Sequence, residues 1–123
     1  MKMTESTEDY LETILMEQCR HGKVRSIDVV NAMGFSRPTV SIAMKKLTEN
    51  GYVTMGDGGN LELTDRGRTV AERVYERHRV IARLLMAIGV DEETAYTDAC
   101  RMEHDMSEKT FSCIKAYYHK IQE

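Results

Sequence analysis

Proline, cysteine pairs and long apolar runs are scarce in this 123-residue sequence. It has one Pro, so long helices meet few interruptions. Its three cysteines lie far apart without a CxxC pair, which argues against a disulfide framework and is typical of a reducing compartment. No apolar run approaches the ~18–20 residues of a membrane span, and the polar, acidic start is unlike a signal peptide. We therefore expect a soluble cytoplasmic protein with no membrane partner.

Charge is unevenly distributed along the chain. The net charge is −3, yet residues 36–83 carry nine Lys or Arg against six Asp or Glu. The remaining residues carry eight basic against fourteen acidic side chains. A basic middle between acidic ends is typical of a DNA-facing surface beside a cation-attracting region, and solvated helix faces are the alternative.

Apolar spacing and capping residues predict a mainly α fold with a small β-hairpin. A short helix over 27–33, with Ser26 as N-cap, precedes a tight turn and a helix over 37–50 capped by Ser36. Strands over 52–55 and 60–63 flank a Gly-rich tip. This order predicts a winged helix-turn-helix domain over residues 1–65 and a helical domain over 66–123. The remaining helices are expected at about 7–21, 65–88, 92–106 and from 108 to the end.

The helix over 37–50 is the candidate recognition helix. Its first turn and exposed face offer hydroxyl and basic side chains to base edges and phosphates in the major groove. Arg66, in the first turn after the hairpin, is a further candidate phosphate contact, whereas a solvated face remains the alternative for such a charge run. The candidate DNA-binding residues are Ser36, Arg37, Pro38, Thr39, Ser41, Lys45, Lys46 and Arg66.

Cys100, Glu103 and His104 stand at positions i, i+3 and i+4 of a predicted helix. This spacing places a thiol, a carboxylate and an imidazole on one face, which favours a metal site. Asp9 and Glu12 form a second helical pair. The alternatives are solvent-facing carboxylates and a small buried thiol. Cys19 and Cys113 are expected in the core.

The sequence resembles the iron- and manganese-dependent repressors, the family of the diphtheria toxin repressor and the manganese transport regulator. The resemblance covers nearly the whole chain, through residues 8–14, 36–41, 63–67, 77–79 and 96–107. It implies a homodimer of winged-helix domains joined by helical dimerisation domains, in a short form without the SH3-like third domain. By position it implies a ligand set of Asp9, Glu12, His78, Cys100, Glu103 and His104.

The implied ligand set is a hybrid of the two branches of the family. Asp9 and Glu12 resemble the manganese branch, whereas Cys100 resembles the iron branch, and whether this thiol bridges two metals or lies in the core is left open. Ala82 and Tyr96 stand where the iron branch has further ligands, so that second site is expected to be absent. We expect one or two ions per subunit, Fe²⁺ or Mn²⁺, with Zn²⁺ or Co²⁺ possible.

The predicted function is metal-dependent repression of metal-uptake genes through a palindromic double-stranded operator, and not enzymatic catalysis. A metal-independent winged-helix regulator that senses a small organic ligand is the first alternative. A metallo-hydrolase would need an open coordination position and a substrate cleft. A metal that only stabilises the dimer is the third alternative.

Overall fold

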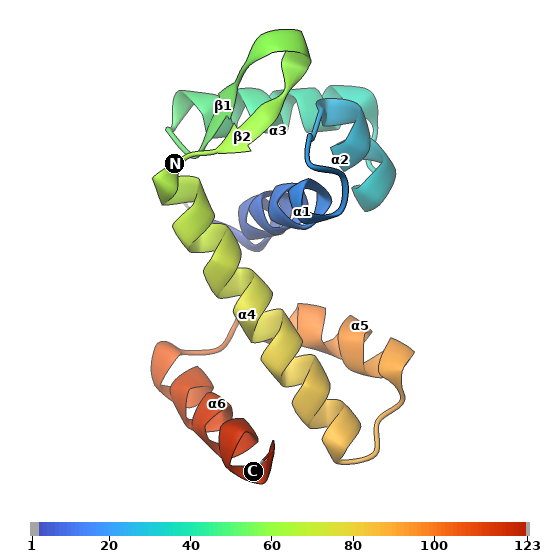
Figure 1. Cartoon of the computed structure of the whole chain (residues 1–123), viewed down its shortest axis with the longest axis vertical. Coiled ribbons are helices and arrows are strands. Elements are labelled where there is room, and N and C mark those ends of the chain that lie inside the picture. Colours follow the sequence, from blue (N-terminus) through green and yellow to red (C-terminus); the bar gives the residue numbers. More distant parts are fainter. Residues whose placement is uncertain (1–2, 123) are drawn as a thin grey trace. The chain divides into compact units, whose positions relative to one another are not determined.

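The computed structural model describes residues 3–122 and divides into two compact units, one ending at Glu72 and the other beginning at Arg73 (Figure 1). The fold is mainly α with a small hairpin, as predicted. No helix in the described part is long and apolar enough to cross a membrane. The elements are α1 (Glu5–His21), α2 (Ser26–Met33), α3 (Arg37–Glu49), β1 (Val53–Met55), a 3-10 turn η1 (Asp57–Gly59), β2 (Leu61–Leu63), α4 (Asp65–Ala87), α5 (Glu92–Met102) and α6 (Glu108–Gln122).

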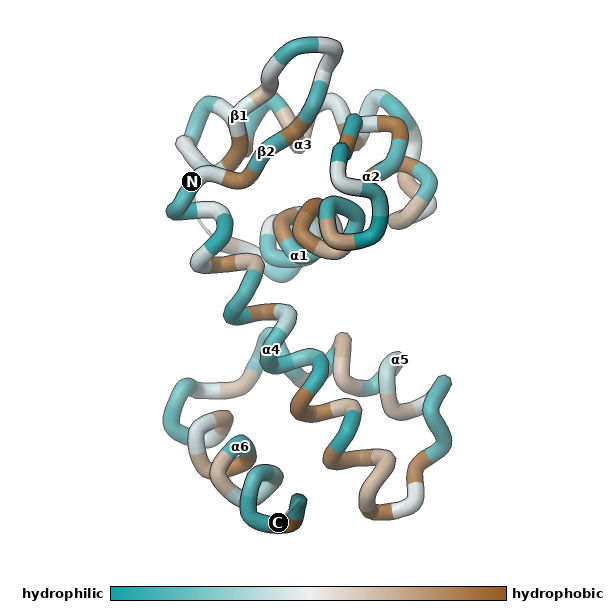
Figure 2. The backbone as a smooth tube through the Cα atoms, in the orientation of Figure 1, coloured by the Kyte–Doolittle hydropathy of each residue, from teal (hydrophilic) through white to brown (hydrophobic). Residues whose placement is uncertain are grey.

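The first unit is built around α1. The Thr4 hydroxyl accepts a hydrogen bond from the Thr7 N–H and so caps the helix, which begins two residues before the predicted start. Gly22 ends it with a φ of +79°, a conformation that costs glycine little. Hydrophobic and hydrophilic stretches alternate along the helix (Figure 2). The apolar stripe is buried and comprises Tyr10, Leu11, Ile14 and Leu15.

The helix-turn-helix consists of α2, a short turn and α3. The predicted cap Ser26 is wrong by one residue: α2 begins at Ser26, and the Asp28 carboxylate accepts from the Arg25 N–H. Gly34 ends α2 in the left-handed region, and Ser36 caps α3 as predicted. The inner face of α3 is fully buried through Val40, Met44 and Leu47. Its opposite face is therefore left for solvent or a ligand.

The wing is the antiparallel hairpin of β1 and β2, with Val53 paired to Leu63 and Met55 to Leu61. The Leu61 N–H donates to the Val24 carbonyl at 2.6 Å, which fixes the hairpin to the segment before α2. The predicted strands are therefore confirmed, each slightly shorter than expected.

The first turn of α4 packs closely against the backbone of Tyr52, the residue before β1. Thr64 caps the helix by accepting from the Gly67 N–H at 3.1 Å, and its own N–H donates to the Tyr52 carbonyl. A Cβ placed on Gly67 would lie 2.0 Å from that carbonyl oxygen. Only glycine allows this close approach.

The second unit consists of α4 from Arg73 onward, α5 and α6. Two clusters form its core: Ile81, Ala82 and Ala99 pack together, and Val80 packs with Phe111 and Tyr118. Helix α5 ends at Met102, four residues before the predicted end. Cys19 and Cys113 are exposed, so their expected place in the core is wrong. The predicted domain boundary after residue 65 stays a prediction.

Candidate functional site

A histidine, a cysteine and a glutamate meet in the second unit. His78 lies on α4, Cys100 in the last turns of α5, and Glu103 directly after that helix. His78 Nδ1 lies 3.1 Å from a Glu103 carboxylate oxygen and 3.5 Å from Cys100 Sγ. One donor atom from each of the three residues lies within 4.8 Å of the others. The structure thus brings three of the predicted ligands together.

The end of α5 places Glu103 and His104. Glu103 keeps helical dihedral angles and its N–H donates to Ala99, so Cys100 and Glu103 retain the i, i+3 relation. His104 lies beyond the helix, which contradicts its predicted place on the same helical face. Its Nε2 nevertheless lies 3.3 Å from the second Glu103 oxygen. The Glu103 side chain is fully buried, with an imidazole at each oxygen.

Arg77 holds this segment from α4. The guanidinium donates to the Glu103 carbonyl at 2.9 Å and to the Met106 carbonyl at 2.8 Å. It also pairs with the Glu108 carboxylate at 2.7 Å and lies 5.2 Å from the centre of the Phe111 ring. Arg77 is 7% exposed, so its bond to the Glu103 carbonyl is a buried charge-assisted bond, whereas those to Met106 and Glu108 are partly buried. No pattern in the neighbouring sequence indicates this role for Arg77.

The protonation of His78 is set by the same cluster. Hydrogen bonds to Cys100 Sγ and then to the Glu103 carboxylate raise the pKa of His78 to about 10, although burial alone would lower it. At neutral pH the imidazole is therefore protonated. A proton thus sits between the thiol and the carboxylate in the metal-free protein.

The donor set fits a divalent transition metal. Imidazole nitrogen, carboxylate oxygen and sulfur are ligands of Fe²⁺, Mn²⁺, Co²⁺ and Zn²⁺, with sulfur favouring the softer ions. A fully buried carboxylate beside two imidazoles is also costly without a cation or protons. Cys100 is exposed, so the alternative that it is a core residue is wrong.

The other implied ligands lie in the first unit. Asp9 and Glu12 stand one turn apart on α1, Asp9 half-buried and Glu12 6% exposed. Their membership of a common metal site stays a prediction. In the second unit Ala82 is fully buried and has no ligand atom, and the Tyr96 ring packs 5.4 Å from the His78 ring. Tyr96 thus supports the histidine through ring packing.

The outer face of α3 is basic and open. Arg37, Lys45 and Lys46 are exposed, and within residues 3–122 none of the three takes part in an ion pair. The Ser36 hydroxyl is occupied at the cap, where it donates to the Thr39 hydroxyl at 2.8 Å. The remaining predicted side chains on this face, Pro38, Thr39 and Ser41, are exposed as well. This surface carries the positive charge that a DNA backbone attracts.

Two further residues of the DNA-binding unit have exposed or surface contacts. Arg66, whose phosphate contact stays a prediction, donates to the Asn50 carbonyl at 2.9 Å and stacks 4.2 Å over the Tyr52 ring. It therefore joins α4 to the end of α3. Ile42 is 58% exposed on α3, and the sequence analysis omitted it because only polar and basic side chains and the proline were considered.

Family comparisons agree with this architecture. Residues 2–58 match the iron dependent repressor N-terminal DNA binding domain, and residues 64–123 match the iron dependent repressor metal binding and dimerisation domain. The transcriptional regulator MntR of Salmonella typhimurium is 33% identical over 113 residues, which are 92% of this chain and 72% of that protein. An uncharacterised HTH-type regulator of Methanocaldococcus jannaschii is 28% identical and is covered over 98% of both chains.

Solved structures give the same picture. The manganese regulator SloR is 27% identical, with a TM-score of 0.81 over 95% of this chain, and the chain spans 55% of its length. A manganese-dependent transcriptional repressor in complex with manganese is 30% identical, with a TM-score of 0.82 over 92% of this chain and 52% of that one. The chain belongs to the iron-dependent repressor family of metal-dependent transcriptional regulators, which combine a DNA-binding domain with a metal-binding and dimerisation domain.

Proposed function

We propose that this protein is a cytoplasmic repressor that binds a palindromic operator as a homodimer when Fe²⁺ or Mn²⁺ is bound, and so limits metal uptake. The observation that carries the proposal is the cluster of His78, Cys100 and Glu103, whose donor atoms lie within 4.8 Å of one another. The open basic face of α3 supports the DNA-binding half.

The proposed ligand set is larger than this cluster. His104, whose Nε2 lies beside the Glu103 carboxylate, belongs to it by contact. Asp9 and Glu12 join it as members of the family pattern. A divalent ion supplies positive charge that compensates the carboxylates and the thiolate. One or two ions per subunit are expected with these six side chains.

The choice of metal ion depends on the donor atoms, and the strength of its binding depends on how firmly they are held. Glu103 and the two histidines suit Fe²⁺ and Mn²⁺ alike, whereas the Cys100 sulfur favours Fe²⁺, Co²⁺ and Zn²⁺ over Mn²⁺. Arg77 fixes the backbone at Glu103, so the carboxylate is preorganised before an ion arrives. We therefore expect Fe²⁺ to be the stronger effector, with Mn²⁺ next.

The DNA-binding half uses α3 in the major groove. Arg37 lies in its first turn, where the N-terminal residues of a recognition helix contact base edges. Lys45 and Lys46 further along carry positive charge for phosphates. In a dimer two copies of α3 meet half-sites one helical turn, ~34 Å, or a multiple of it apart. Metal and operator then strengthen each other's binding reciprocally.

The test is an anaerobic DNA-binding titration of the chelator-stripped protein with Fe²⁺, Mn²⁺, Co²⁺ or Zn²⁺ added singly. The probe is the DNA upstream of its own gene and of neighbouring metal-transport genes. We expect tight binding only with metal, and its loss in Glu103→Gln. Lys115→Met, which removes an ion pair with Glu76 but no metal donor, should behave as the parent protein.

The alternatives give different results. Equal DNA binding with and without metal contradicts the proposal and points to a regulator of the metal-independent kind. Metal binding that raises the dimer mass but leaves DNA affinity unchanged indicates a purely structural ion. Nothing in the described residues favours a hydrolase over these two.

A further inference from the structure

The outer face of α3 carries one large apolar side chain among polar ones. Ile42 is 58% exposed, and no other large hydrophobic residue of α3 is exposed. Its neighbours along the helix surface, three residues before and four after, are Thr39 and Lys46. An isoleucine left in water here contributes nothing to the core of the unit, which α3 completes through its opposite face.

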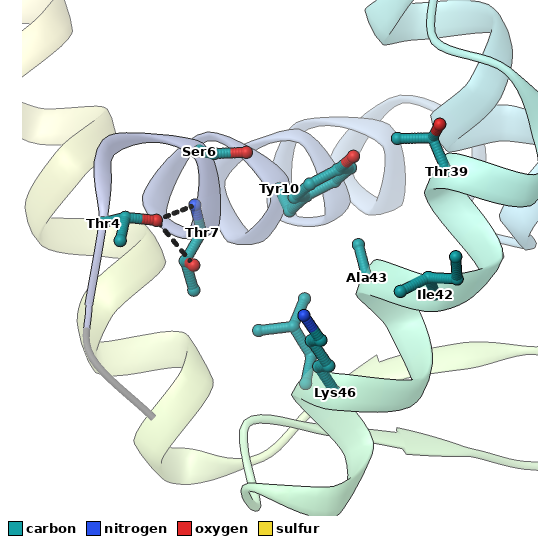
Figure 3. A pocket seen from close by; sticks show the side chains of 9 residues that line it. Thr4, Ser6, Thr7, Tyr10, Thr39, Ile42, Ala43 and Lys46 are labelled. Carbon is teal, nitrogen blue, oxygen red and sulfur yellow. Dashed lines mark hydrogen bonds between the residues drawn. The ribbon is translucent and has the colours of Figure 1, made fainter.

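The surroundings of Ile42 indicate what covers it. A hollow of about 380 Å³ lies beside it between α1 and α3 (Figure 3). The walls of this hollow are mainly apolar, and Lys46 gives it one positive charge next to Ile42. An ammonium beside an exposed aliphatic side chain suits a DNA groove, where a phosphate lies close to the base edges. Figure 3 labels eight of the side chains that line the hollow: Thr4, Ser6, Thr7, Tyr10, Thr39, Ile42, Ala43 and Lys46.

The major groove offers one apolar group at the edges of the four standard bases, the C5-methyl of thymine. Hydroxyl and ammonium groups distinguish bases weakly, because they contact several donors or acceptors equally well. A branched aliphatic side chain instead adds binding free energy only where it packs against a methyl group. The chemistry of Ile42 therefore selects a thymine.

We propose that Ile42 is a specificity-determining residue that packs against a thymine C5-methyl in each operator half-site. This inference rests on the proposed DNA-binding function and adds the base that α3 selects. Burying one methyl group corresponds to about fourfold in affinity, from ~0.8 kcal/mol. Removing the methyl from both half-sites of a dimer should therefore weaken binding about 15-fold.

The experiment begins with selection of the preferred duplex from randomised DNA by the metal-loaded protein. Each thymine of the selected site is then replaced by uracil, which lacks only the methyl. We expect one or two positions per half-site where uracil weakens binding about fourfold, from ~0.8 kcal/mol per methyl. Ile42→Ala should bind thymine and uracil duplexes equally at that position. Met55→Ala, which removes another exposed apolar side chain from the same unit, should keep the full uracil effect.

The outcomes separate this inference from the proposed function. Metal-dependent, sequence-selective binding with uracil effects that persist in Ile42→Ala overturns the role of Ile42 alone. The role of Ile42 is equally overturned if Ile42→Ala weakens binding to all sequences by the same factor. Failure of the parent protein to select any sequence with metal overturns both proposals. Circular dichroism of Ile42→Ala verifies the fold, which an exposed substitution should leave intact.

Discussion

Replacing Arg77 by Met should destabilise the second unit and weaken its metal site. The methionine keeps an aliphatic stem but removes the two bonds to the Glu103 and Met106 carbonyls. Each bond from a charged donor contributes about 1.5–3 kcal/mol, so the pair accounts for about 3–6 kcal/mol. The bond to Glu108 adds little, because that carboxylate is 70% exposed.

Two measurements test this prediction. Urea unfolding of the metal-free protein, at one protomer concentration, should give a free energy of unfolding lower by about 3–6 kcal/mol. Metal affinity should fall about 10–100-fold, the usual effect of losing a group that orients a ligand. Arg77→Lys keeps the charge but not the forked geometry and should fall between the parent and Arg77→Met.

Glu108→Gln is the matched control. It neutralises one partner of Arg77 but leaves both carbonyl bonds in place. Its destabilisation should stay below about 1 kcal/mol, with unchanged metal affinity. If Arg77→Met costs no more than Glu108→Gln, the reasoning that Arg77 anchors the Glu103 backbone is refuted.

Three further predictions follow from single contacts. Gly67→Ala should lower the free energy of unfolding of the first unit by about 2–4 kcal/mol, because its Cβ would lie 2.0 Å from the Tyr52 carbonyl oxygen. Gly56→Ala, whose Cβ would lie 3.8 Å from its nearest atom, should change it by less than about 0.5 kcal/mol in the same thermal unfolding experiment. Cys100→Glu should shift metal activation of DNA binding from Fe²⁺ toward Mn²⁺, and an unchanged ranking would show that sulfur does not set the preference. Metal affinity should rise about tenfold per pH unit from pH 6 to 9, because the ion displaces one proton from His78. Calorimetry in buffers of different ionisation enthalpy counts the protons released.

Capping residues and glycines in the sequence predicted those helices and strands whose ends are set by residues close by in the chain. Ser36 caps α3 as expected, and Ser107 caps α6 in the same way, because each hydroxyl accepts from the N–H three residues later. The Gly-rich tip likewise predicted the wing. The spacing of Cys100 and Glu103 predicted that both lie on one helix face, whereas their meeting with His78 of α4 was implied only by the family resemblance.

Features that depend on distant residues could not be predicted in this way. Helix α5 ends at Met102 without Gly or Pro, because Arg77 binds the Glu103 and Met106 carbonyls and Ser107 starts a new helix. Arg77 lies 26 residues before Glu103, so no pattern among neighbouring residues predicts the contact. The two exposed cysteines were misplaced because sulfur was treated as apolar, and Ile42 was missed because hydrophobicity was equated with the core.

Without metal, the positive charge beside the Glu103 carboxylate comes from the protonated imidazole of His78. A His78 proton lies where the thiol and the Glu103 carboxylate converge, and the pKa of about 10 keeps it there at neutral pH. Because this folded-state pKa exceeds the ordinary 6.5, the charged imidazole stabilises the metal-free fold fully below pH 6.5, and that contribution is lost as pH rises toward 10. Metal affinity changes in the opposite direction over the same range, since the ion must displace the proton. Raising the pH therefore lowers the stability of the metal-free protein while strengthening its response to metal, and this opposition follows only if proton and metal compete for the same donors.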